Sequence, residues 1–177
     1  MQRYSRETLS LPPEVLTDRL RLRPLELGDE PLLWRINSDP EVMRYVMPPA
    51  TDRDVHRAEY QQDLDSGDRF KFFYAITWKD SGACEGWIFL RPTEDGKSLE
   101  MGYRLQPSAW GKGLVPEAAR AFMSLARQRW QAHGFIALIL PGNHASQRVT
   151  EKLGFEMKGL TSEYYEDEIT ELWVYRY

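Results

Sequence analysis

One segment restricts the fold more than any other: a strand pattern, a glycine-containing loop, a helix pattern and a second strand pattern follow one another without interruption. Ser98–Leu105 alternates, the loop Trp110–Val115 reads WGKGLV, apolar residues recur at three- and four-residue steps from Pro116 to Trp130, and Phe135–Leu140 is apolar throughout. This order predicts a strand-helix-strand crossover joining two strands of one sheet.

The other periodic segments predict a mixed α/β (α+β) fold. We expect further strands over Leu20–Leu25, Lys71–Trp78, Gly86–Leu90, Phe155–Leu160 and Thr170–Tyr177, and helices starting after Asp29, from about Arg53 to Leu64 and from about Ala145 to Leu153. The first helix is expected to end at Asn37, Asp39 and Pro40. The sheet is therefore expected to be mostly antiparallel, with about six to seven strands and flanking helices. Residues 1–177 are expected to form a single domain, with residues 1–16 as an extended arm.

Composition narrows the classes of function. The chain has 177 residues, a net charge of −4 and no apolar run near the roughly 20 residues that cross a bilayer. We therefore expect a cytoplasmic protein that binds neither membrane nor nucleic acid. The three histidines show no ligand spacing, so no metal site is predicted. The single cysteine, Cys84, is interpreted as a small strand residue rather than a nucleophile.

The glycine loop is a candidate anion site because of its position between a strand and a helix. Gly111 and Gly113 let the backbone turn closely around an anion, and the first amides of the following helix have no intrahelical acceptor. A pyrophosphate suits such a site. Leu114 and Val115 after Gly113 exclude a Walker A motif, and a dinucleotide fold would place the loop after its first strand.

A second motif follows about thirty residues later, in Asn143–Phe155. Read together with Thr17–Arg23, Leu99–Leu105, Trp110–Gly113 and Pro116–Ala118, it makes the chain resemble the GNAT superfamily of acyl-CoA N-acyltransferases. The resemblance is closer to the RimJ/RimL-like branch, which acetylates protein N-termini. It implies a GNAT fold with a splayed V between the central strands and acetyl-CoA as co-substrate.

The resemblance also implies which residues bind coenzyme A. The phosphates are expected on Trp110, Gly111, Lys112, Gly113, Leu114 and Val115, and the pantetheine arm beside Tyr103, Arg104 and Leu105, with further contacts from Asn143 and Ser146. The loop departs from the usual superfamily pattern, which begins with Gln or Arg and ends with Gly or Ala. By spacing alone, Asn143 is equally well a helix or turn cap.

Two residues are candidate catalytic groups. In RimL-like enzymes the position of Ser146 is proposed to protonate the departing thiolate, although a serine in a first helical turn is also ordinary. Glu100 is the candidate general base, because the attacking amine must lose a proton. Its alternative is an ion pair with Arg104 or Lys97, and Glu85 is the reserve base.

The acceptor is expected to be a protein N-terminal α-amine that attacks acetyl-CoA directly in a ternary complex. A polyamine, an aminoglycoside or an amino-acid-like metabolite is the alternative, and a non-catalytic acyl-CoA sensor is the alternative of another class. An acidic run of Glu163, Glu166, Asp167, Glu168 and Glu171 either attracts a cationic acceptor or is a solvated loop. We expect a monomer or a homodimer, the latter paired through an exposed final strand.

Overall fold

The computed structural model describes residues 4–5, 9–10, 12–67, 72–165 and 168–177, with the side chains of 162–170 left aside. Its elements in chain order are β1 (Val15–Leu16), β2 (Leu20–Pro24), η1 (Leu27–Asp29), α1 (Glu30–Asn37), α2 (Pro40–Met43), α3 (Arg53–Ser66), β3 (Phe73–Trp78), β4 (Cys84–Pro92), β5 (Leu99–Leu105), η2 (Pro107–Ala109), α4 (Leu114–Trp130), β6 (Phe135–Ile139), α5 (His144–Leu153), β7 (Glu156–Tyr165) and β8 (Glu168–Arg176).

The strands form one mixed sheet in the order β1-β2-β3-β4-β5-β6-β8-β7. The expected mixed, mostly antiparallel α/β fold is confirmed. Within the described residues the sheet has eight strands, one more than the seven segments expected from sequence. The additional strand, β1, lies at the end of the expected arm, where Val15 pairs with Leu22 and Leu16 with Arg21. Two residues are too few to show a period of two, so pairing alone creates this strand.

The chain divides into two compact units, and β4, β5 and α4 have residues in both. We call Leu11–Phe89 with Tyr103–Ala118 the loop unit, because it contains the glycine loop. We call Met1–Ser10, Leu90–Gly102 and Ala119–Tyr177 the crossover unit.

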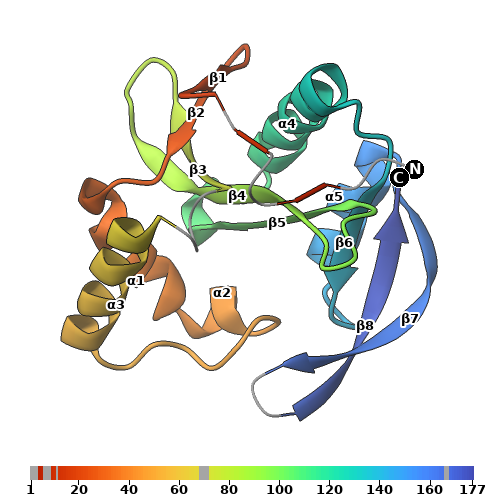
Figure 1. Cartoon of the computed structure of the whole chain (residues 1–177). Helices are drawn as coiled ribbons and strands as arrows, with labels where there is room; N and C mark the ends of the chain where they lie inside the picture. Colours follow the sequence, from red (N-terminus) through yellow and green to blue (C-terminus); the bar gives the residue numbers. More distant parts are fainter. Residues whose placement is uncertain (1–3, 6–8, 11, 68–71, 166–167) are drawn as a thin grey trace. The chain divides into compact units, whose positions relative to one another are not determined.

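The loop unit contains the antiparallel strands β1 to β3 and most of β4. Between β3 and β4 the register shifts from Ile76↔Gly86 to Thr77↔Cys84, which makes Glu85 an extra residue on its strand. Helices α1 and α3 lie side by side in this unit (Figure 1). Six side chains form a buried apolar cluster beside them: Leu25, Leu33, Tyr60, Ala75, Trp87 and Phe89.

The boundaries of α3 follow the local signals in the sequence. The Asp52 carboxylate accepts the amides of Asp54 and Val55, and Gly67 ends the helix with a φ of 68°. The expected end of the first helix is confirmed, because α1 ends at Asn37 with Ser38 as its C-cap. Asp39 caps a new short helix, α2, whose first residue is Pro40.

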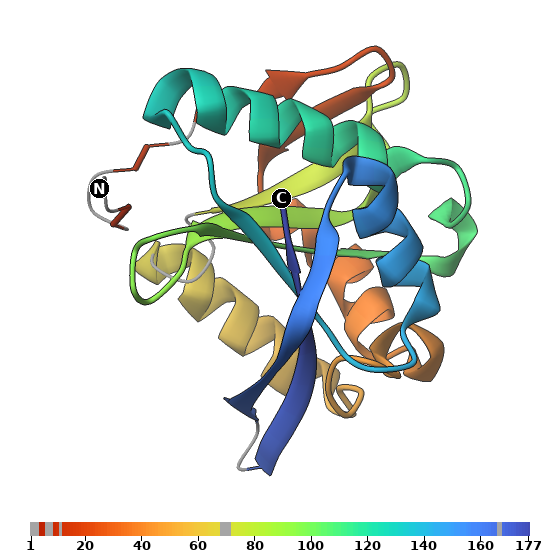
Figure 2. The same cartoon turned by 90° about the vertical axis from the view of Figure 1, so that its right-hand side faces the viewer.

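The crossover unit contains the parallel pair predicted from sequence, with Leu99 opposite Phe135 and Glu100 opposite Ile136. Next to β6, the strands β8 and β7 form a long antiparallel hairpin (Figure 2). The expected exposed final strand is therefore wrong: β8 is paired on both sides and β7 is the edge strand. The sequence shows two adjacent strands but not which of them inserts beside β6.

Helix α4 begins at Leu114, two residues before the expected start at Pro116. Leu114 and Val115 are only 1% and 4% exposed, and the Glu117 amide donates to the Gly113 carbonyl. Both side chains are thus held in the core while the chain makes its first helical turn. Further along α4, the predicted apolar positions Ala119, Phe122 and Ala126 are buried.

Candidate functional site

The glycine loop is an exposed turn whose conformation depends on its two glycines. Gly111 and Gly113 have φ values of 73° and 76°, a region in which residues with a Cβ are strained. A Cβ at Gly111 would meet nothing within 4 Å, and one at Gly113 would meet only Arg19 Nη2 at 3.6 Å. The glycines therefore serve the backbone path and leave open space above it.

The residues on both sides of the glycines fix the loop. The Trp110 indole N–H donates to the Leu105 carbonyl at 3.0 Å, and its backbone amide donates to Pro107. The side chain of Val115 points into the core. Its bulk therefore does not occupy the open side of the loop, and the departure from the usual superfamily pattern leaves the backbone accessible.

The electrostatics of the loop suit a phosphate group. The first backbone N–H groups of a helix lack intrahelical acceptors, and the helix dipole adds partial positive charge at the start of α4. Lys112 is exposed between the two glycines. Open space, amide donors and a cation together fit the pyrophosphate of a nucleotide-like cofactor.

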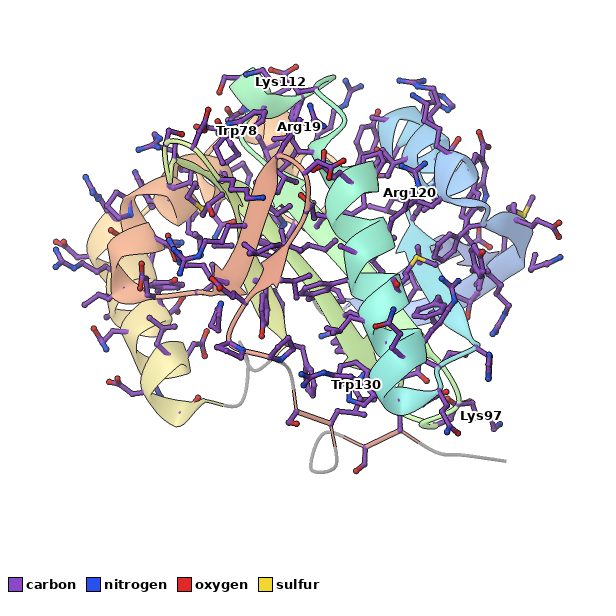
Figure 3. All side chains as sticks on the ribbon, turned by 90° about the horizontal axis from the view of Figure 1, so that it is seen from above. Arg19, Trp78, Lys97, Lys112, Arg120 and Trp130 are labelled. Carbon is purple, nitrogen blue, oxygen red and sulfur yellow. The ribbon has the colours of Figure 1, made fainter. Side chains whose placement is uncertain are left out.

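Thr17, Arg19 and Glu117 support this loop, and none of them is among the predicted site residues. Thr17 Oγ1 donates to Glu117 Oε1 at 2.5 Å, and Arg19 Nε donates to Glu117 Oε2 at 2.7 Å. Arg19 Nη1 also donates to the Lys112 carbonyl at 3.1 Å. Figure 3 shows Arg19 next to Lys112 and Trp78. Glu117 lies 98 positions from Arg19, so no local pattern predicts their pairing.

The residues expected beside the pantetheine arm, Tyr103, Arg104 and Leu105, also lie in the loop unit, at the end of β5. Arg104 Nη1 donates to Asn37 Oδ1 at 2.9 Å, and its guanidinium lies 5.1 Å from the centre of the Trp87 ring. A Cβ at Gly86 would approach the Arg104 carbonyl to 2.0 Å, so a glycine is required there.

Asn143 and Ser146 are brought together in the crossover unit, at the start of α5. Asn143 is the N-cap, and its Oδ1 accepts the Ser146 amide at 3.2 Å. The cap occupies the oxygen and leaves the side-chain NH₂ to donate elsewhere. The Ser146 hydroxyl is half-buried in the first helical turn, where the dipole favours a nearby negative charge.

Glu100, also in the crossover unit, has a partner that the sequence did not indicate. Its Oε2 accepts from Arg91 Nε at 3.1 Å and Nη2 at 3.0 Å, whereas Lys97 pairs with Asp95 and Arg104 donates to Asn37. The Glu100 side chain is 18% exposed. Its Oε1 accepts no hydrogen bond from the part of the chain that the structure describes, so one oxygen is left to accept a proton.

Glu85, the reserve base, is buried and both of its oxygens are engaged. Trp78 Nε1 donates to Oε1 at 2.6 Å, and Gln106 Nε2 donates to Oε2. The Gln106 amide also donates to the Glu85 carbonyl. These bonds tie the segment after β5 to β4, which is a positioning role.

Cys84 does not have the properties of a nucleophile. Burial, followed by the negative charge of Asp29, raises the pKa of its thiol to about 12, so the thiolate is rare at neutral pH. Its Sγ lies 3.5 Å from the Gly86 carbonyl. This agrees with its interpretation as a small strand residue.

The acidic run, metal ligation and membrane spans were the other features expected from the sequence. The acidic run lies mostly outside the described side chains; Glu171 is exposed. Among the described residues there is no cluster of three metal-ligating side chains, and no helix is long and apolar enough to span a membrane.

Comparison with known proteins gives one consistent family. The model of the acetyltransferase (GNAT) domain matches residues 19–156. The uncharacterized N-acetyltransferase p20 of Bacillus licheniformis is 31% identical over 156 residues, which cover 85% of this chain and 86% of that protein.

Two solved structures share the fold. A GNAT-family acetyltransferase from Bacillus anthracis has a TM-score of 0.80 at 22% identity, covering 93% of this chain and 97% of that one. RimL, a ribosomal L7/L12 α-N-protein acetyltransferase solved with coenzyme A, has a TM-score of 0.75 at 19% identity, covering 93% and 97%.

Proposed function

This chain belongs to the acetyltransferase (GNAT) family and is an acetyl-CoA-dependent acetyltransferase, and on that premise we propose that it acetylates a protein N-terminal α-amine. The observation that carries the cofactor assignment is the exposed loop at Gly111 and Gly113, directly before α4. The fold shared with RimL supports the choice of acceptor. The family match runs through residues of both units, which supports one functional domain over residues 1–177.

The proposed cofactor contacts follow from the chemistry of each segment. The amides of residues 111–115 hold the pyrophosphate of coenzyme A, because they lie in and directly after the exposed turn at the start of a helix, where the first N–H groups have no intrahelical acceptor. The backbone of Tyr103–Leu105 pairs with the amide groups of the pantetheine arm, as an added strand would. The Asn143 NH₂ group donates to the same arm while its oxygen caps α5.

The proposed reaction is direct transfer. The neutral amine attacks the thioester carbonyl, a C–N bond forms, the C–S bond breaks, and the thiolate of coenzyme A leaves. Glu100 Oε1 receives the ammonium proton, directly or through water, before the attack. Ser146 Oγ gives a proton to the departing thiolate, and the second proton, which the attacking nitrogen loses as the amide forms, returns through water to Ser146 Oγ. Glu100 then releases its proton to solvent, so the cycle releases one proton for each ammonium group acetylated.

An acceptor panel with detection of released thiol tests the proposal. The panel contains peptides with a free α-amine, the same peptides with a blocked N-terminus and one lysine, polyamines and aminoglycosides. We expect turnover with the free α-amine peptides and at least about tenfold less with the blocked peptides. This difference corresponds to about 1.4 kcal/mol in transition-state binding.

Other outcomes select the alternatives. Turnover confined to polyamines or aminoglycosides assigns a small-amine acetyltransferase and ends the N-terminal proposal. Tight binding of coenzyme A without thiol release over the whole panel favours the acyl-CoA sensor.

A further inference from the structure

We infer that Arg19 is a positioning residue for the cofactor loop and supplies one guanidinium nitrogen to the phosphates of coenzyme A. The inference deepens the proposed function and rests on binding of coenzyme A at Gly111–Val115. Arg19 lies in the turn between β1 and β2, and no predicted site residue lies in that turn.

The guanidinium of Arg19 donates to two protein groups near the cofactor loop. Arg19 Nε is bound to the Glu117 carboxylate at 2.7 Å and Nη1 to the Lys112 carbonyl at 3.1 Å. The two bonds connect the β1–β2 turn to the first turn of α4 and to the middle of the loop. A single side chain thus fixes the distance between the loop and the helix start.

The third guanidinium nitrogen of Arg19, Nη2, is the one that we propose binds phosphate. Nη2 has no hydrogen bond to any described residue, and it lies 3.6 Å from the position of a Cβ on Gly113. Nη2 therefore lies beside the side of Gly113 that carries no side chain, which is where the proposed function places the phosphate. Arginine suits this role because its planar fork binds two protein groups and still presents a donor to an anion.

Arg19 also balances the negative charge of Glu117. A carboxylate in the first turn of α4 would repel phosphate if its charge were not balanced. The Thr17 hydroxyl and the Arg19 amide donate to Oε1, and Arg19 Nε donates to Oε2. Burial raises the pKa of Glu117, but the hydrogen bonds from Thr17 and Arg19 outweigh it and the pKa is lowered. Glu117 therefore stays ionised, and Arg19 is the cation that neutralises it next to the loop.

The surface above the guanidinium supports the same orientation. The Arg19 guanidinium lies 5.8 Å from the centre of the Trp78 ring, and its side chain is 46% exposed (Figure 3). The Lys79 amide donates to the Arg19 carbonyl, which fixes the backbone of the turn. Arg19 is thus held in place while its outer face remains open to solvent.

The test compares Arg19→Lys with a matched control, Arg21→Lys. Arg21 is also half-exposed and binds a glutamate, Glu14, through Nε at 2.8 Å, but among the described residues it donates no hydrogen bond to the loop. We expect Arg19→Lys to raise the Kd of coenzyme A about tenfold in calorimetry and Arg21→Lys to leave it unchanged. Unaltered coenzyme A affinity in Arg19→Lys overturns the inference and leaves the proposed function intact.

Two further measurements separate this role from a general effect on folding. Pantetheine, which carries no phosphate, should stabilise wild type and Arg19→Lys equally against thermal unfolding; an equal loss for pantetheine and coenzyme A contradicts the inference. In the Arg19→Ala background, Glu117→Gln should recover at least about threefold of the lost coenzyme A affinity, because it removes the unbalanced charge. No recovery contradicts the charge argument. If wild type fails to bind coenzyme A at all, the inference and the proposed cofactor site fall together.

Discussion

Arg23 and Asp29 form a two-pronged ion pair in the loop unit, in which Nη1 and Nη2 each donate to one carboxylate oxygen at 2.8 Å. The Asp29 side chain is 3% exposed, and its Oδ2 also accepts the Glu26 amide. The hydrogen bond to Asp29 raises the pKa of Arg23, so the arginine stays charged at every accessible pH. The pair fastens the end of β2 to the start of α1.

We expect Asp29→Ala to lower the free energy of unfolding by about 2 to 4 kcal/mol, because it removes the buried carboxylate that binds both Nη atoms and leaves only the exposed carboxylate of Glu26, 3.3 Å from Nη2. Denaturant unfolding measures the change. The control is Glu14→Ala, which removes the exposed partner of Arg21 and should cost less than about 1 kcal/mol. Equal losses in the two variants would show that burial does not strengthen the Arg23–Asp29 pair.

Coenzyme A should raise the thermal stability of wild type, because it binds only the folded state. At a concentration one hundred times the Kd, the gain is about 2.7 kcal/mol. Gly113→Val should abolish this ligand-induced shift in Tm, since a β-branched side chain resists the φ of 76° and occupies the open side of the loop.

The control for backbone strain is Gly82→Val. Gly82 has a φ of 71° and open surroundings in a turn outside the glycine loop. Gly82→Val should lower the Tm of the free protein but keep the increase in Tm that coenzyme A causes. A full shift in Gly113→Val would place the phosphate site elsewhere.

Ser146→Ala should lower kcat by about 10²-fold and leave acetyl-CoA affinity nearly unchanged, because a proton donor to the leaving thiolate acts in the transition state. The Asn143 cap binds the backbone amide of residue 146, so the substitution leaves the start of α5 intact. Ser146→Thr, which keeps a hydroxyl, should retain more activity than Ser146→Ala. Parallel losses of kcat and affinity would instead assign Ser146 to cofactor positioning.

Glu100→Gln should lower kcat most at neutral pH and recover as pH rises, because the variant must wait for amine that solvent has already deprotonated. The expected loss at neutral pH is about 10²- to 10⁴-fold. The measurement is kcat against pH with saturating acceptor. Glu156→Gln breaks an exposed ion pair with Lys158 in the same unit and should change little. A Glu100→Gln profile that matches wild type from neutral to alkaline pH would make Glu100 structural, paired with Arg91.

No acetyl-enzyme should form on Cys84. With a pKa of about 12 in the folded state against about 8.5 in an unfolded chain, the thiol stays protonated from pH 7 to 9 while the chain is folded. We expect no mass increase of the protein after incubation with acetyl-CoA, and slow labelling by thiol reagents that accelerates on unfolding. Cys84→Ala should keep its activity. A thioester on Cys84 would contradict direct transfer.

Because the folded pKa of Cys84 is raised, this thiol favours the folded state below about pH 8.5, and its contribution to stability is lost as pH rises toward 12.

The sequence by itself determined the features that depend on neighbouring residues. Asp52 caps the start of α3 and Gly67 ends it, because each acts on backbone amides or dihedral angles within a few positions. The strand before the loop, the glycines and the helix face of α4 followed from periodicity and from the φ values that only glycine adopts readily. Those features were sufficient to indicate the sheet class and the position of the exposed glycine loop that we propose as the phosphate site.

Tertiary structure alone decided the features that depend on pairing between distant segments. The insertion of β8 between β6 and β7, the start of α4 at Leu114 and the two-residue strand β1 each follow from burial or pairing that no local pattern encodes. The same holds for the partner of Glu100, which is Arg91 on the preceding strand, and for Arg19, which meets Glu117 only when the β1–β2 turn packs against the helix start. A side chain's charge can be read from one position, but its partner is fixed only when the backbone brings two positions together.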